Sequence, residues 1–306
     1  MSASFAPALH AAREAASHQH YPQGALFVVA TPIGNLADIT LRALHVLALV
    51  DAVACEDTRH TQQLLRAYGI ERPGAQLLAV HQHNEAEAAG AVIDHLRHGL
   101  RIAYVSDAGT PAVSDPGARL VAAVRAAGLP VVPLPGASSI TTLLSAAGMT
   151  QEGGFVFAGF LPSKAAERER AVQLLAVEPR AVVLLEAPHR IAALAGALAT
   201  LGERPVTFGR ELTKQFEEIA TLPASDGPAW LAADGNRQRG EFVVVLHGAP
   251  VAADAGDDQR VLKLLLAELP LKTAVKLAAE ITGSSKNTLY DAALVLKKSA
   301  DGAENS

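Results

Sequence analysis

The chain has 306 residues, of which 50% are apolar and 19% are charged, and its net charge is −5. These values indicate a globular protein of more than one domain and argue against a chain that is basic over its whole surface. No apolar run reaches about 18 residues, which excludes a transmembrane helix. The single cysteine, Cys55, excludes an internal disulfide and a cysteine-rich zinc site.

The first 148 residues are predicted to form a flexible start followed by an α/β domain. Residues 1–23 hold no apolar signal core and are expected to be flexible. From residue 24 to residue 148, short apolar runs alternate with segments of helical periodicity, which is typical of a parallel sheet. The predicted strands are 26–31, 52–55, 76–80, 101–106 and 130–134. The predicted helices are 38–50, 58–68, 84–96, 116–127 and 138–147.

A second α/β domain is predicted over residues 149–249, and the pattern over 215–235 leaves strand and helix open. Its predicted strands are 155–160, 181–185, 205–209 and 242–246, and its predicted helices are 163–177 and 191–201. Gly, Pro and Asp gather over residues 249–258, which indicates a linker. A helical tail is expected over residues 257–299. Its two short helices, 274–281 and 287–297, flank Gly283 in the pattern of a helix-turn-helix.

The C-terminal segment differs in charge from the rest of the chain. Between Arg260 and Lys298 there are seven basic and three acidic residues, whereas the residues before Arg260 are acidic on balance. A basic element that follows an acidic body indicates contact with an anionic partner. The same charges also fit a solvated helical surface, and the sequence leaves both interpretations open.

Four polar loops each follow a predicted strand of the first domain, at residues 31–35, 56–59, 107–111 and 135–139. Because parallel strands end at one edge of a sheet, these loops are expected to meet there, where α/β proteins bind small ligands. The loop at 107–111 lacks the sequence of a P-loop, so a nucleotide phosphate is not its expected ligand.

These loops, together with motifs of the second domain, resemble one group of enzymes. The further motifs are Phe157-Ala158-Gly159-Phe160-Leu161-Pro162, Glu186-Ala187-Pro188-His189-Arg190, Gly209-Arg210-Glu211-Leu212-Thr213-Lys214 and Gly240-Glu241-Phe242. Over residues 26–248 the combination is similar to small-subunit ribosomal RNA 2′-O-ribose methyltransferases of the tetrapyrrole methylase superfamily. The chain has Gly109-Thr110-Pro111 where tetrapyrrole-modifying relatives have Gly-Asp-Pro, which favours the RNA branch.

The resemblance implies a two-domain, tetrapyrrole-methylase-like α/β fold (class III among methyltransferases) with a small helical C-terminal extension. It implies that S-adenosyl-L-methionine binds between the domains and that the ribose of a cytidine in the decoding region of 16S rRNA accepts the methyl group. The implied partner is small-subunit ribosomal RNA or the small ribosomal subunit, and the implied state is a cytoplasmic homodimer. Two other functions stay open, namely C-methylation of a tetrapyrrole and a non-catalytic role in RNA binding or assembly.

The resemblance and the loop chemistry together suggest which residues hold the cofactor. A methyl sulfonium needs an aligned nucleophile more than acid–base help, so loop backbones and small side chains suit it. The residues assigned to the cofactor are Ile33, Asp107, Ala108, Gly109, Thr110, Val113 and Ser138 in the first domain and Leu185, Glu186 and Glu241 in the second. Packing or capping explains Val113, Ser138 and Leu185 equally well.

The charged residues of the motifs are candidates for acting on the RNA. A ribose hydroxyl is a weak acid, so a base near it would assist its attack. The candidate bases are Glu56, Asp57, His189, Glu211 and Lys214. Arg59 and Arg190 are expected to hold RNA phosphates through forked hydrogen bonds. The catalytic group is therefore predicted to comprise Asp57, Arg59, His189, Arg190 and Glu211, although structural ion pairs would explain these residues too. No zinc-ligand spacing is present, so no metal site is expected.

Overall fold

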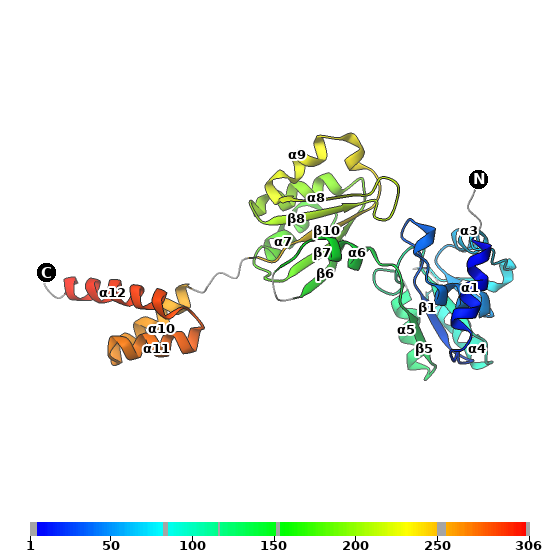
Figure 1. Cartoon of the computed structure of the whole chain (residues 1–306), viewed down its shortest axis with the longest axis horizontal. Helices are drawn as coiled ribbons and strands as arrows, with labels where there is room; N and C mark the ends of the chain where they lie inside the picture. Colours follow the sequence, from blue (N-terminus) through cyan, green and yellow to red (C-terminus); the bar gives the residue numbers. More distant parts are fainter. Residues whose placement is uncertain (1–4, 82–84, 116, 151–153, 250–254, 304–306) are drawn as a thin grey trace. The chain divides into compact units, whose positions relative to one another are not determined.

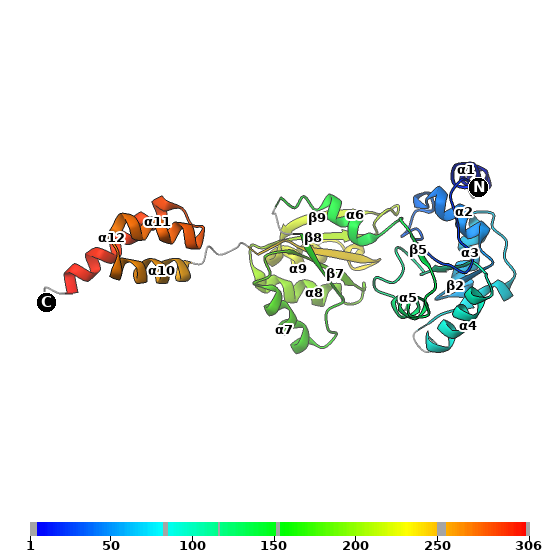
Figure 2. The same cartoon turned by 90° about the horizontal axis from the view of Figure 1, so that it is seen from below.

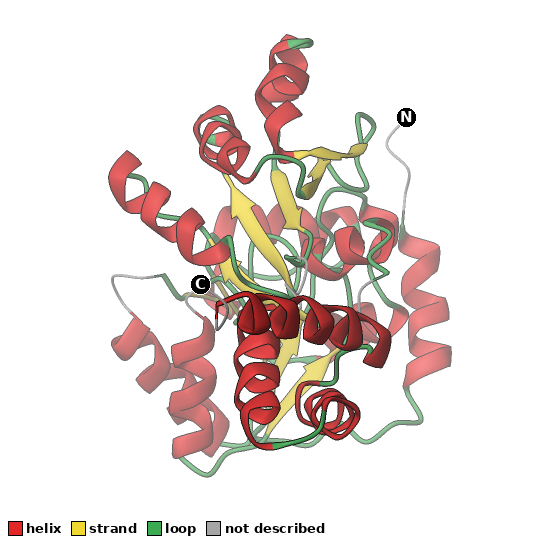
Figure 3. Cartoon of the chain, turned by 90° about the vertical axis from the view of Figure 1, so that its left-hand side faces the viewer, coloured by secondary structure: helices red, strands yellow, loops and turns green. Residues whose placement is uncertain are grey.

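The computed structural model describes residues 5–81, 85–115, 117–150, 154–249 and 255–303. Contacts divide the chain into two units, Met1–Gly248 and Ala249–Ser306. The first unit contains two five-stranded sheets. The secondary-structure elements in the described part of the second unit are all helices. Figure 3 draws all helices of the chain in red and all strands in yellow.

The first sheet is parallel throughout, with strand order β3-β2-β4-β1-β5. Its strands are β1 (Leu26–Val29), β2 (Ala52–Cys55), β3 (Leu77–Ala79), β4 (Ile102–Val105) and β5 (Val131–Leu134). Every residue of β1, β2 and β4 is buried. Continuous apolar runs are what a parallel sheet with both faces covered requires, because alternate side chains point to opposite faces.

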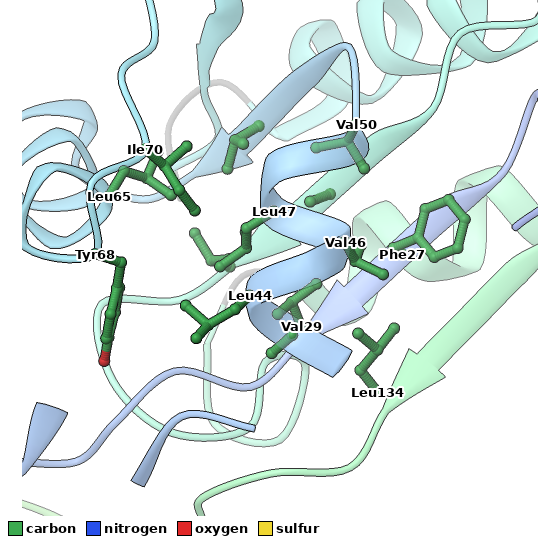
Figure 4. Close-up of a cluster of buried hydrophobic side chains, with 14 of the residues drawn as sticks. Phe27, Val29, Leu44, Val46, Leu47, Val50, Leu65, Tyr68, Ile70 and Leu134 are labelled. Carbon is green, nitrogen blue, oxygen red and sulfur yellow. The ribbon is translucent and has the colours of Figure 1, made fainter. Parts of the chain in front are cut away.

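Helices cover both faces of this sheet (Figures 1 and 2). Their bounds are α1 (Ala6–Ala16), α2 (Leu41–Leu49), α3 (Thr58–Ala67), α4 (Glu85–Arg97) and α5 (Gly117–Ala126). On one face, side chains of α1, α2 and α3 share a core with Phe27 and Val29 of β1 (Figure 4). On the other face, side chains of α4 and α5 pack around Leu26 and Tyr104.

The described part of the N-terminal region, residues 5–23, contradicts the expectation of flexibility, and residues 1–4 of the predicted range 1–23 lie outside the described residues. Residues 6–16 form α1, in which Ala12 is fully buried in the core that also holds residues of α2. The Tyr21 hydroxyl donates a hydrogen bond to the carbonyl oxygen of Ala16 at 3.0 Å, which fixes the chain after the helix. The prediction failed because the buried face of α1 consists mainly of alanines, whose apolar pattern is weak.

The second sheet is mixed, with strand order β6-β7-β10-β8-β9. Its strands are β6 (Phe155–Gly159), β7 (Ala181–Glu186), β8 (Pro205–Arg210), β9 (Glu218–Pro223) and β10 (Phe242–Leu246). Only the β6–β7 pair is parallel, and the other three pairs are antiparallel. Helices α7 (Ala165–Leu175), α8 (Ile191–Leu198) and α9 (Gly227–Ala232) share one core with this sheet. The segment 215–235, left open by its sequence, thus contains both a strand and a helix.

Helix α6 (Ser139–Ala146) follows the last strand of the first sheet but packs on the second sheet. Ile140 and Leu143 share a core with Val183 and Val243 of the central strands β7 and β10. A Cβ atom placed on Gly209 of β8 would lie 2.5 Å from a methyl carbon of Leu143, so glycine permits this close approach. The predicted boundary at residue 148 therefore stays a prediction, because contacts join both sheets into one unit.

The second unit contains three helices in its described part: α10 (Ala255–Glu268), α11 (Leu271–Thr282) and α12 (Lys286–Ala303). They share a small apolar core that includes Leu262, Ala278 and Leu289. Gly283 ends α11 with a φ of 74°, which suits glycine in the turn before α12. None of the described helices is both long and apolar enough to cross a membrane.

Two other boundaries differ from those predicted. Helix α2 begins at Leu41 and not at the predicted residue 38, because the Thr40 hydroxyl accepts a hydrogen bond from the Ala43 amide and caps the helix there. The predicted linker 249–258 overlaps α10, which begins at Ala255. Asn84 and Pro116, the predicted first residues of the helices 84–96 and 116–127, lie outside the described residues.

Candidate active site

The loops after β1, β4 and β5 are tied together at the carboxyl edge of the first sheet. Thr31 and Gly109 exchange two backbone hydrogen bonds, of 2.9 and 3.0 Å. The Thr110 hydroxyl donates to the carbonyl oxygen of Ala137 at 2.9 Å. These contacts confirm convergence for three of the four predicted loops, and they use backbone groups and a small hydroxyl.

Gly109 is required by the backbone at this junction. Its φ is 80°, in the left-handed region that other residues rarely adopt. A Cβ atom on Gly109 would also lie 3.3 Å from a methyl carbon of Ile33. A glycine therefore permits both the bend of the loop and its close packing on the loop after β1.

A hollow of about 370 Å³, here called the first hollow, opens between this edge and the second sheet. Its lining is mostly apolar and comprises Ile33, Ala108, Ser139, Phe160, Leu185, Glu186, Ala187, Pro188, Leu212, Glu241, Phe242 and Val243. Its size and apolar character, with a few polar groups, are typical of a small-molecule site.

A second hollow of about 380 Å³ adjoins the first. Both hollows are lined by Ile33, Ala108 and Glu241. The other residues of the second hollow are Pro32, Gly34, Leu36, His60, Gln63, Leu64, Ala67, Asp107 and Lys214. The second hollow is thus more polar than the first. Residues of α3 form part of its wall, and Lys214 adds a charged group.

Lys214 lies at the junction of the two domains. Its Nζ donates to Glu211 Oε1 at 2.9 Å and to Glu241 Oε2 at 2.8 Å. Burial lowers the pKa of Lys214, but these two carboxylates outweigh it and hold the pKa above its ordinary value. A Cβ on Gly34 would meet the Lys214 stem at 2.3 Å, so this glycine admits the lysine. Lys214 therefore stays protonated, which does not suit a base.

Glu211 is held by the same ion-pair cluster. Its Oε1 also accepts a hydrogen bond from the Glu241 amide at 2.9 Å. Burial raises the pKa of Glu211, but the bonds from Lys214 and Glu241 bring it below its ordinary value. The residue has a φ of 50°, which is uncommon outside glycine and persists where the surroundings fix it.

Glu186 and Arg190 form an ion pair beside the first hollow. Arg190 Nε lies 3.0 Å from Glu186 Oε1, and the Glu186 side chain is fully buried. The same oxygen accepts a hydrogen bond from the Ala187 amide at 2.9 Å, and the Arg190 guanidinium donates to the carbonyl oxygen of Leu161. The guanidinium of Arg190 is thus engaged by the protein itself.

Two adjacent carboxylates after β2 have opposite electrostatic environments. Burial raises the pKa of Glu56 to about 7, with a further contribution from the charges of Asp115 and Asp107. Hydrogen bonds from the Arg59 and His60 amides lower the pKa of Asp57, whose carboxylate caps α3. Asp57 thus has a structural role as a helix cap, which was not predicted from the sequence.

The structure brings together only part of the predicted site. Five residues assigned to the cofactor line the first hollow: Ile33, Ala108, Leu185, Glu186 and Glu241. Asp107 lines the second hollow. Gly109 and Thr110 line neither hollow, but their hydrogen bonds to Thr31 and Ala137 join the loops after β1, β4 and β5. Val113 is exposed, and Ser138 precedes α6 while its neighbour Ser139 lines the hollow.

The predicted catalytic residues are more dispersed. Arg59 and His189 are exposed and line neither hollow, and Asp57 is occupied as a helix cap. Sequence reasoning missed His60 and Gln63, which lie one helical turn apart on α3. Their spacing of three residues was the available signal, since it places side chains on one helix face. Among the described residues no group of three His, Cys, Asp or Glu side chains forms a metal site.

Comparisons with known proteins decide the family. A model of the tetrapyrrole (corrin/porphyrin) methylases matches residues 25–226. The chain belongs to this family. A second model, the RsmI C-terminal HTH domain, matches residues 252–297, in agreement with the helix-turn-helix predicted there. The α/β methylase fold with a helical extension is thereby confirmed.

Curated relatives within the family are closely similar over most of the chain. The ribosomal RNA small subunit methyltransferase I of Pseudomonas aeruginosa is 50% identical over 277 residues, which are 89% of this chain and 97% of the relative. The protein of the same name from Escherichia coli O157:H7 is 48% identical and covers 89% of this chain and 95% of the relative. The resemblance predicted from the motifs is confirmed, and membership of this methylase family makes the protein a methyltransferase.

Solved structures share the methylase fold at low identity. A cobalt precorrin-4 methyltransferase aligns with a TM-score of 0.54 at 18% identity, covering 74% of this chain and 98% of its own. Diphthine synthase aligns with a TM-score of 0.52 at 13% identity, covering 73% and 90%. At these identities the likeness concerns the fold alone.

The first hollow fits the cofactor of such enzymes. Glu186 Oε2 is buried and has no hydrogen-bond partner among the described residues, although Glu186 lines the hollow. A buried acceptor without a partner is costly, and a ligand that carries hydroxyl or amino donors would satisfy it. Both the apolar lining and this acceptor suit S-adenosyl-L-methionine, which has an aromatic base, ribose hydroxyls and an amino group.

Proposed function

We propose that this methyltransferase uses S-adenosyl-L-methionine to methylate the ribose 2′-hydroxyl of a cytidine in the decoding region of 16S ribosomal RNA. The observation that carries the proposal is the 50% identity to a ribosomal RNA small subunit methyltransferase I over 89% of the chain. The Gly109-Thr110-Pro111 sequence supports the RNA substrate over a tetrapyrrole. The proposed setting is the bacterial cytoplasm, where the small ribosomal subunit is found.

In this proposal the first hollow holds the cofactor, which supplies an electrophilic methyl group on a positively charged sulfur. Ile33, Ala108 and Leu185 would pack against its apolar parts, and Glu186 Oε2 would accept a hydrogen bond from it. Gly109 and Thr110 would act through the backbone by fixing the loop that carries Ala108. Asp107, Val113, Ser138 and Glu241 complete the proposed cofactor group.

The roles of the charged residues follow from what already engages them. Arg59 is exposed at the start of α3, and its guanidinium is proposed to bind an RNA phosphate. His189 is exposed after β7 and stays a proposed base, together with Asp57 and Glu211. Arg190 is proposed to contact RNA. Its ion pair with Glu186 also supports a structural role for this residue.

A homodimer is part of the proposal. Phe155 on β6, an edge strand of the second sheet, is 47% exposed, and Leu174 and Val177 near the end of α7 are 76% and 80% exposed. Contiguous exposed apolar patches are typical of association surfaces, and these three side chains are the proposed members of such a patch. Sedimentation velocity would measure the oligomeric state directly.

Transfer of a tritiated methyl group from labelled S-adenosyl-L-methionine to purified small ribosomal subunits tests the proposed function. We expect label in 16S RNA, and nuclease digestion should locate it on a ribose. A chain that ends at Gly248, the last residue of the first unit, should keep its affinity for the cofactor and lose activity on the subunit. Binding of wild-type protein should weaken with salt, and the truncated chain should show a smaller salt dependence because the basic segment is removed. Absence of transfer to ribosomal RNA would contradict the proposal.

A further inference from the structure

We infer that the second hollow receives the acceptor nucleotide, and that His60 and Gln63 of α3 contact it. This inference rests on the proposed function, because it takes the first hollow as the cofactor site. It adds two residues that the motif analysis did not place in the site.

The relation between the hollows carries the first step. Direct methyl transfer needs the acceptor oxygen about 3–3.5 Å from the carbon it attacks, so the acceptor site must open onto the donor site. Ile33, Ala108 and Glu241 line both hollows, which places the two cavities side by side along the same loops. A nucleotide in the second hollow would therefore have its ribose next to a cofactor in the first.

The chemistry of the lining carries the second step. The second hollow presents an imidazole, a carboxamide, an ammonium group and two carboxylates, from His60, Gln63, Lys214, Asp107 and Glu241. A nucleotide carries hydrogen-bond donors and acceptors on both its base and its ribose, and RNA-binding proteins read such edges with polar side chains. The carboxamide of Gln63 can both donate and accept, so it matches a base edge that does the same.

The state of α3 carries the third step. Within the described residues, no hydrogen bond engages the Gln63 carboxamide or the His60 ring. The neighbouring Gln62 does not line the hollow, and its Nε2 donates to the carbonyl oxygen of Arg72 at 3.5 Å. Two glutamines next to each other in the chain thus differ in surroundings, one facing the cavity and one bound to the protein.

This pair gives a matched experiment on the full-length protein. Gln63→Ala and His60→Ala should each raise KM for small ribosomal subunits about three- to tenfold, the worth of a neutral hydrogen bond, with kcat changed less. Calorimetry should show unchanged affinity for S-adenosyl-L-methionine. Gln62→Ala should leave KM unchanged. A third variant, Ala67→Phe, adds a ring to the lining of the hollow and should weaken binding of labelled subunits without affecting the cofactor.

The outcomes separate this inference from the proposed function. If Gln63→Ala and Gln62→Ala give the same KM, or if Gln63→Ala weakens cofactor binding, the assignment of the second hollow is wrong. If wild-type protein transfers no methyl group, the proposed function fails, and subunit binding by Ala67→Phe still decides whether RNA enters the hollow. Unchanged subunit affinity in a folded Ala67→Phe protein would then overturn the inference.

Discussion

The two sheets of the first unit contribute to the candidate site in different ways. The first sheet contributes loops held by backbone hydrogen bonds and small residues, as between Thr31 and Gly109. The second sheet contributes ion pairs, Glu186 with Arg190 and Lys214 with Glu211 and Glu241. The first arrangement gives shape that does not depend on pH, whereas the second places charge at the edge of the same cavities. A glycine substitution should therefore damage the shape of the site, whereas a charge substitution should damage its electrostatics.

The largest expected effect is on the backbone side of this comparison. Gly109→Val should abolish measurable cofactor binding, because its side chain would press on Ile33 and disturb the loop that carries Ala108. Gly128→Val is the matched control, since Gly128 has a φ of 74° and nothing lies within 4 Å of its would-be Cβ. Both variants should lose about 1–2 kcal/mol of stability from left-handed strain.

Calorimetry and urea unfolding of the two glycine variants distinguish a local from a global effect. Equal loss of cofactor affinity in both variants would mean that destabilisation, and not the shape of the loop at Gly109, explains the result. Unchanged affinity in a folded Gly109→Val protein would show that the loop after β4 lies outside the cofactor site.

The sequence predicts the backbone side of the site better than the charged side. Convergence of the loops at Thr31, Gly109 and Ala137 follows from a general property of parallel sheets, so local patterns suffice. The partners of Arg190 and Lys214 depend on where side chains from separate strands end, and local pattern contains no such information. For the same reason the sequence points to the charged motif Glu56-Asp57-Thr58-Arg59 and not to His60 and Gln63, although His60 and Gln63 line the second hollow.

Similar limits explain the errors in the fold. Strand β2 was predicted with its exact bounds because buried parallel strands are continuous apolar runs. The sequence of β9 does not distinguish strand from helix, because this edge strand has only exposed and half-buried positions and so lacks a clear apolar pattern. Helix α1 was missed because alanines such as Ala12 give a weak apolar signal even when fully buried.

The next largest effect concerns the ion pair beside the first hollow. Arg190→Ala leaves the fully buried Glu186 carboxylate without its counter-charge and should lower the free energy of unfolding by about 3 kcal/mol. Arg180→Ala is the control, because the Arg180 side chain is 51% exposed in its pair with Glu178 and exposed ion pairs contribute little to stability. Urea unfolding measures both values.

Steady-state kinetics on small ribosomal subunits then separates the two readings of Arg190. Arg59→Ala should raise KM for RNA with little change in stability, because its exposed guanidinium is proposed to bind phosphate alone. If Arg190→Ala behaves like Arg59→Ala, with higher KM and unchanged stability, the ion pair with Glu186 is unimportant and Arg190 is free to contact RNA.

The last and smallest change concerns two carboxylates of the first sheet, Glu56 and Asp57, which follow β2. They are an exception, because the other loops of this sheet contribute backbone groups and small residues to the site. The folded protein holds the proton of Glu56 up to about pH 7, whereas a Glu in the unfolded chain releases it near 4.5. Between these values the folded state binds more protons than the unfolded state, so this residue makes stability fall as pH rises.

Glu56→Gln should therefore reduce the fall in the free energy of unfolding between pH 4.5 and 7.5. The difference in stability between the variant and wild type should favour the variant most above pH 7. Asp57→Asn is the control, because the lowered pKa of Asp57 places its titration below pH 3.8 and outside this window. Urea unfolding at four pH values within the window measures the free energy of unfolding of each variant. If this free energy changes with pH in the same way for Glu56→Gln and wild type, the raised pKa of Glu56 is contradicted, and its carboxyl is ionised throughout the window.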